Sequence, residues 1–120
     1  MKIDYTTYLK IIASFPEVPP ERGGIIGGKN KTVTEFVLDD KNTFTDKAMY
    51  VPDVEFINTQ IEIWQSLNIN FYGIIHSHKF DSNLSQEDIN YIKKIMTHTP
   101  DNMKELFFPI IIPNRKIVFY

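Results

Sequence analysis

The apolar run at residues 71–75, followed directly by His76, Ser77 and His78, constrains this chain more than any other feature. A continuous apolar run of this length is typical of a strand that is buried on both faces, in the middle of a sheet. Side chains alternate between the faces of a strand, so His76 and His78 are predicted to point the same way. The sequence therefore predicts two adjacent imidazoles at the polar end of a central strand.

The chain before this strand is predicted to contain a helix, a hairpin and a second helix. Asp4 is expected to cap the first helix, which ends at Pro16. Its apolar stripe is predicted to consist of Tyr5, Tyr8, Leu9 and Ile12. Residues 21–28 and 32–38 are predicted to pair as a hairpin, and glycines in the first strand are typical of a bulge or of close approach by a backbone or ligand.

A polar loop over residues 39–52 is predicted to connect the hairpin to the second helix. This helix is predicted to cover residues 53–67, with Asp53 as its cap. The inward side chains of this helix are predicted to be Phe56, Ile57, Ile61, Trp64 and Leu67. A third helix is predicted to begin at Ser85 and to end before Pro100, with Ile89, Ile92 and Met96 on one side. Residues 106–112 and 116–120 are predicted to be strands joined by a turn. This order predicts one α/β domain over residues 1–120, with a mixed β-sheet flanked by helices.

Composition excludes several classes of function. The 13 Lys and Arg residues against 15 Asp and Glu residues form no block of one charge, so neither a nucleic-acid surface nor an anionic-membrane surface is expected. The chain has no cysteine, which excludes disulfides, cysteine-bound zinc and a thiol nucleophile. No apolar run approaches the roughly 18 residues of a membrane span, and the N-terminus lacks the pattern of a secretory signal. A cytoplasmic location is therefore expected.

The two predicted imidazoles are candidate metal ligands. A carboxylate from the following helix would bring the number of protein ligands to three, which is typical of a catalytic zinc that keeps one position for water. Each feature alone also has a purely structural interpretation. Two histidines on a strand are often unrelated to metal, and Ser85 with Asp88 is also a good helix start. Glu21 can be an ordinary loop carboxylate.

Taken together, three segments resemble the JAMM motif of the JAB/MPN-domain zinc metalloproteases. They are residues 21–27, residues 76–78 and residues 85–88, in this order along the chain. The resemblance covers most of the chain and implies the JAB/MPN fold, which has a cytidine-deaminase-like architecture. Two departures from the family pattern are Lys79, where proline is usual, and a gap of six residues between His78 and Ser85, which is one residue short.

The resemblance also implies the roles of five residues. His76, His78 and Asp88 would bind Zn²⁺, with Asp81 and Glu87 as competing third ligands because of the shortened loop. Glu21 would hold and deprotonate the attacking water, and Ser85 would stabilise the oxyanion. These residue types suit the chemistry, because zinc activates water and a nearby carboxylate can carry its proton.

The resemblance implies a zinc-dependent metallopeptidase or isopeptidase that hydrolyses an amide bond in a peptide, a ubiquitin-like protein or a small carrier protein. An extended substrate tail would lie beside the site, with residues 43–52 as the expected contact. The alternative is a catalytically silent scaffold or protein-binding module of the same fold. A nucleobase deaminase is excluded because its usual cysteine ligands are absent.

Overall fold

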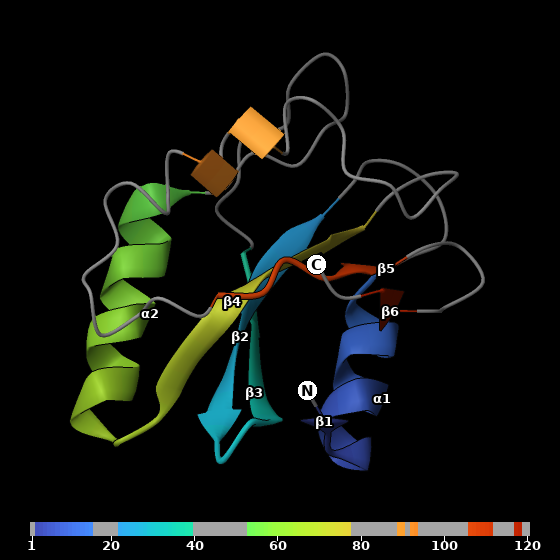
Figure 1. The fold of residues 1–120 in the computed structure, drawn as a ribbon, viewed down its shortest axis with the longest axis horizontal. Coiled ribbons are helices and arrows are strands. Elements are labelled where there is room, and N and C mark those ends of the chain that lie inside the picture. The colour runs from blue at the N-terminus through green and yellow to red at the C-terminus, as the bar shows by residue number, and fades with distance from the viewer. Residues whose placement is uncertain are drawn as a thin grey trace.

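The computed structural model describes residues 2–15, 22–39, 53–77, 89–90, 92–93, 106–111 and 117–118. Its elements are β1 (Lys2–Ile3), α1 (Tyr5–Ser14), β2 (Gly23–Lys29), β3 (Thr32–Leu38), α2 (Val54–Ser66), β4 (Asn70–Ser77), β5 (Ile110–Ile111) and β6 (Ile117–Val118). The described strands form one mixed sheet in the order β1-β3-β2-β4-β5-β6, with α1 and α2 on opposite faces (Figure 1). The predicted α/β fold class is confirmed.

The central position predicted for the histidine-bearing strand is confirmed. β4 lies between β2, to which it is antiparallel, and β5, to which it is parallel. The predicted hairpin is also confirmed, because β2 and β3 are antiparallel and joined by a tight turn with positive φ at Asn30 and Lys31. The ladder between β2 and β3 shifts its register between Gly27 and Gly28, which is the bulge that the glycines indicated.

Both predicted helix caps are present. The Asp4 carboxylate accepts a hydrogen bond from the Thr7 backbone N–H at 2.7 Å, and the Asp53 carboxylate accepts one from Phe56 at 3.1 Å. On α2 the predicted inward residues Phe56, Ile57, Ile61 and Trp64 all pack in one hydrophobic cluster against β2 and β4. Leu67 is 57% exposed, so its predicted inward position is wrong; the helix has ended and Leu67 is its C-terminal cap.

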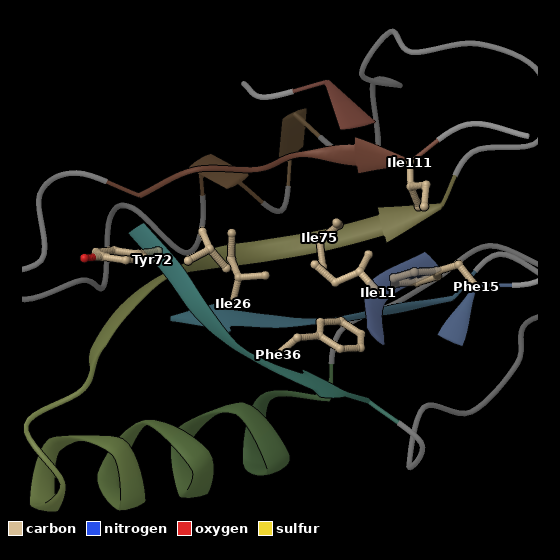
Figure 2. Close-up of a cluster of buried hydrophobic side chains, with 8 residues drawn as sticks. Ile11, Phe15, Ile26, Phe36, Tyr72, Ile75 and Ile111 are labelled. Carbon is tan, nitrogen blue, oxygen red and sulfur yellow. The ribbon is translucent and has the colours of Figure 1, made fainter. Parts of the chain in front are cut away.

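The packing of α1 differs from the predicted apolar stripe. Tyr5 and Leu9 are exposed, whereas Thr7 and Ile11 are buried. Figure 2 shows Ile11 beside Ile75, Phe15 and Phe36, in the cluster between α1 and the sheet. Ile12 of the predicted stripe does pack against this cluster. Tyr5 and Leu9 were wrong because the way in which α1 meets β3 selects the buried face, and helical periodicity alone does not fix it.

Two further differences concern strands. β1 was not predicted; it adds to the edge of the sheet by pairing parallel with β3 at Thr32 and Val33. The predicted strand at residues 106–112 is interrupted, with an isolated bridge from Phe107 to Gly73 and a regular strand only at β5. Pro109 explains the interruption, since proline has no N–H to donate to a ladder.

The predicted third helix is described only in part. Residues 89–90 and 92–93 are helical, and Ile92 packs against the cluster beneath α2. The predicted start of this helix at Ser85 lies outside the described residues. None of the described helices is both long enough and apolar enough to cross a bilayer.

Candidate metal centre

Four elements meet at one end of the sheet. β4 ends there at Ser77, β3 ends at Leu38, β2 begins at Gly23, and α2 begins beside them. α2 begins at this end because it runs antiparallel to β4, to which a short turn connects it (Figure 1). The polar residues at this end are therefore contributed by segments that are far apart in the sequence.

His76 occupies the last fully paired row of β4. Its residue is completely buried, with Gly23 of β2 on one side and Ile110 of β5 on the other. The His76 backbone N–H donates to the carbonyl of Pro109 at 3.2 Å. Because side chains alternate along a strand, the imidazole lies on the same face as Ile74, which is the face that α2 covers. The backbone on both sides therefore fixes the direction of this imidazole.

Ser77 joins the end of β4 to the residue that precedes β2. The Ser77 backbone N–H donates to the Arg22 carbonyl at 2.8 Å, and the Arg22 N–H donates to the Ser77 hydroxyl oxygen at 2.8 Å. The hydroxyl is also 3.3 Å from the Arg22 carbonyl, to which it can donate. These bonds connect residues that are 55 positions apart in the sequence.

Asp39, the first residue of the predicted polar loop, is a buried acidic residue at this end. It is 5% exposed, its N–H donates to the Gly23 carbonyl at 2.9 Å, and its carboxylate accepts from the Asp53 N–H at 2.9 Å. Asp39, Gly23 and His76 thus form one row across three strands, and Gly23 places no side chain between the other two. The pairing register of the hairpin explains why Asp39 lies here, because it sets Asp39 opposite Gly23.

The described residues include one of the five predicted site residues, His76. Glu21, His78, Ser85 and Asp88 lie outside them, as do the competing ligands Asp81 and Glu87 and the predicted substrate contact at residues 43–52. Within the described parts of the chain, no group of three His, Cys, Asp or Glu side chains is placed to hold a metal ion.

Two of the described segments end next to predicted site residues in the sequence. Glu21 directly precedes Arg22 in the chain, and His78 directly follows Ser77. Arg22 and Ser77, which are hydrogen-bonded to each other, lie at the end of the sheet where His76 lies. Imidazole nitrogen and carboxylate oxygen are donors that zinc accepts.

Comparison with known proteins shows similarity in fold. One similar structure is the solution structure of a protein from Desulfitobacterium hafniense, with a TM-score of 0.68 and 19% sequence identity. The match covers 98% of this chain and 80% of that protein's chain. Another is the crystal structure of a JAB1/MPN domain protein from Archaeoglobus fulgidus, with a TM-score of 0.59 and 17% sequence identity. The match covers 100% of this chain and 88% of that protein's chain. No protein-family model matches the chain, and no curated protein matches its sequence. The fold is therefore an α/β fold similar to that of a JAB/MPN domain protein.

Proposed function

We propose that this chain is a zinc-dependent hydrolase of the JAB/MPN type, which cleaves peptide or isopeptide amide bonds. The observation that carries the proposal is the hydrogen-bonded pair of Arg22 and Ser77. It joins the residue after Glu21 to the residue between His76 and His78, so that two separate parts of the proposed motif share one end of the sheet. The similarity in fold to a JAB/MPN domain protein supports the same conclusion.

In this proposal the metal ligands are His76, His78 and Asp88. Zinc, when bound, supplies Lewis acidity that lowers the pKa of a water molecule and polarises the amide carbonyl. The burial of His76 suits a ligand, because a side chain held by packing on both sides loses little conformational freedom when it coordinates.

The remaining chemistry belongs to Glu21 and Ser85. Glu21 would take a proton from the attacking water, whose oxygen forms a bond to the carbonyl carbon. Ser85 would donate a hydrogen bond to the carbonyl oxygen as that oxygen gains negative charge. Glu21 would then return the proton to the amide nitrogen while the C–N bond breaks, so that the products are a carboxylic acid and an amine.

The substrate class in this proposal is a peptide, or the extended tail of a ubiquitin-like or small carrier protein. An amide that is to be cleaved would lie at the end of the sheet where β2 begins and β4 ends, outside the buried His76. An extended backbone is the substrate form that fits such a position, since it can add hydrogen bonds to neighbouring main chain.

The test combines metal analysis with hydrolysis of defined probes. Protein purified without chelator is expected to contain one zinc ion per chain and to cleave a fluorogenic peptide or an isopeptide-linked ubiquitin tail. Chelation should abolish cleavage, and added zinc should restore it. Glu21→Gln should retain zinc and lose turnover, whereas His76→Ala should lose zinc.

Two results would contradict the proposal. Full turnover by Glu21→Gln would remove the proposed base, and zinc content unchanged by His76→Ala would remove the proposed ligand. Protein that binds zinc through His76 but hydrolyses neither probe would instead be the catalytically silent binding module.

A further inference from the structure

We propose that Ser77 is a positioning residue, whose hydroxyl fixes the peptide bond between Glu21 and Arg22 and so sets the place of the Glu21 carboxylate. This inference rests on the proposed function, because it assigns a role to Ser77 in the reaction of Glu21. Ser77 is not itself proposed to touch zinc or substrate.

The geometry of the last pair of β2 and β4 carries the inference. Residues opposite each other in a hydrogen-bonded antiparallel pair normally exchange two backbone hydrogen bonds. Here Ser77 gives its N–H to the Arg22 carbonyl at 2.8 Å, which is the first of these bonds. The second bond is different, because the Arg22 N–H donates to the Ser77 side-chain oxygen at 2.8 Å. A hydroxyl thus occupies the acceptor position that a backbone carbonyl takes in a regular ladder.

Because this acceptor is a side-chain hydroxyl, one side chain holds the backbone next to the proposed base. The Arg22 nitrogen belongs to the peptide unit that contains the Glu21 carbonyl, and this unit is planar. The Cα atom of Glu21 is therefore about 2.4 Å from the nitrogen that Ser77 holds, from standard bond lengths. The hydrogen bond between the Arg22 N–H and the Ser77 hydroxyl is partly buried. A water molecule therefore replaces it less well than it would replace a hydrogen bond at an exposed site.

The same residue is covalently placed between the two proposed histidine ligands. His76 precedes Ser77 and His78 follows it. Ser77 is therefore linked by peptide bonds to both proposed ligands, and by two hydrogen bonds to the residue that follows the proposed base. Only serine and threonine offer a hydroxyl at this distance from the backbone, so alanine would remove the connection and threonine would keep it.

The expected effect of Ser77→Ala is a loss of kcat with little change in KM or zinc affinity. A misplacement of about 1 Å in a catalytic group can reduce the rate by about 100-fold, so a loss of about 10-fold to 100-fold is expected. Ser77→Thr should recover most of the rate. Ser66→Ala is the matched control, because the exposed Ser66 hydroxyl donates to the carbonyl of Ile63 within α2 and should not affect catalysis.

A double-variant comparison separates positioning from a general structural role. In the Glu21→Gln background the residual rate should be insensitive to Ser77→Ala, since the group that Ser77 positions is already inactive. A purely structural loss would lower both rates by the same factor. Amide hydrogen exchange gives a readout that does not depend on activity, and the Arg22 N–H should exchange faster in Ser77→Ala but not in Ser66→Ala.

Failure of this inference is distinguishable from failure of the proposed function. If wild-type protein neither binds zinc nor cleaves either probe, the proposed function is wrong, and so is the catalytic role of Ser77. If wild-type protein is active and Ser77→Ala keeps its kcat, or loses activity only through loss of zinc, the positioning role alone is overturned. An equal loss in the Glu21→Gln background would overturn it as well.

Discussion

Gly73 lies where the chain before β5 runs parallel beside β4. Its replacement by alanine is expected to be severely destabilising. Its φ is +150°, a conformation that residues with a side chain rarely adopt. A Cβ atom at this position would lie 1.7 Å from the Phe107 carbonyl oxygen and 2.7 Å from the carbonyl carbon. Both obstacles are backbone atoms, so no side-chain rotation can relieve the contact. The two segments would have to separate by roughly 1.5–2 Å, since van der Waals contact begins near 3.4 Å.

The size of the expected loss in stability follows from the hydrogen bonds that separating the two segments would disrupt. Ile74 donates to Phe107 at 3.2 Å, Phe107 donates to Tyr72 at 2.7 Å, and His76 donates to Pro109 at 3.2 Å. Each is worth about 1 kcal/mol of stability, and backbone strain at a positive φ adds about 1–2 kcal/mol. Gly73→Ala should therefore lower the free energy of unfolding by about 4 kcal/mol. For a chain of this length that corresponds to a fall in Tm of roughly 15 °C.

Thermal and urea unfolding, followed by circular dichroism and by the fluorescence of Trp64, the single tryptophan, would measure this loss. Asn70→Ala is the matched control on the same strand; the residue is exposed, and its replacement should change stability by about 0.5 kcal/mol or less. If Gly73→Ala does not accumulate as folded protein while Asn70→Ala does, the expectation is met. A Gly73→Ala protein within about 1 kcal/mol of wild type would refute the close approach of Phe107.

Three other predictions follow from contacts on the same sheet and its helices. Asp39→Ala should lower the free energy of unfolding by about 1–3 kcal/mol in urea titrations, because the Asp53 N–H loses its acceptor; an unchanged midpoint would contradict this. Trp64→Ala should cost about 3–5 kcal/mol, measured by circular dichroism, because the ring is buried between α2 and the sheet; a loss below about 1 kcal/mol would contradict that packing. Hydrogen bonds from the Thr7 side chain and backbone lower the pKa of Asp4, so its stabilising contribution is present above the unfolded carboxyl's pKa and is lost as pH falls through the folded one. Asp4→Asn should therefore show a shallower loss of Tm on acidification than wild type, and parallel curves would argue against this assignment.

The local elements were readable from the sequence because their causes are local. Alternating and continuous apolar residues identified β3 and β4, and Asp4 and Asp53 identified the starts of α1 and α2. The central position of β4 also followed from sequence, since a strand that is apolar on both faces must be covered on both. Among the candidate site residues, His76 could be placed at the end of that strand for the same reason.

Other features were decided by contacts between distant segments. The buried face of α1 depends on how the helix meets β3, which is why Ile11 is buried and Leu9 is exposed. The pairing of β1 with β3 involves only two residues on each strand, too few to leave a recognisable pattern.

The sequence by itself determined that a central strand carries His76 at its polar end, because the continuous apolar run before it lies in neighbouring residues. Only the tertiary structure decided what lies next to that strand end: the hydroxyl of Ser77 on the Arg22 N–H, and the Asp39 carboxylate one glycine away from His76. The physical reason is that hydrogen bonds across a sheet depend on its register and strand order. Both are set by the packing of the whole domain and not by any single segment.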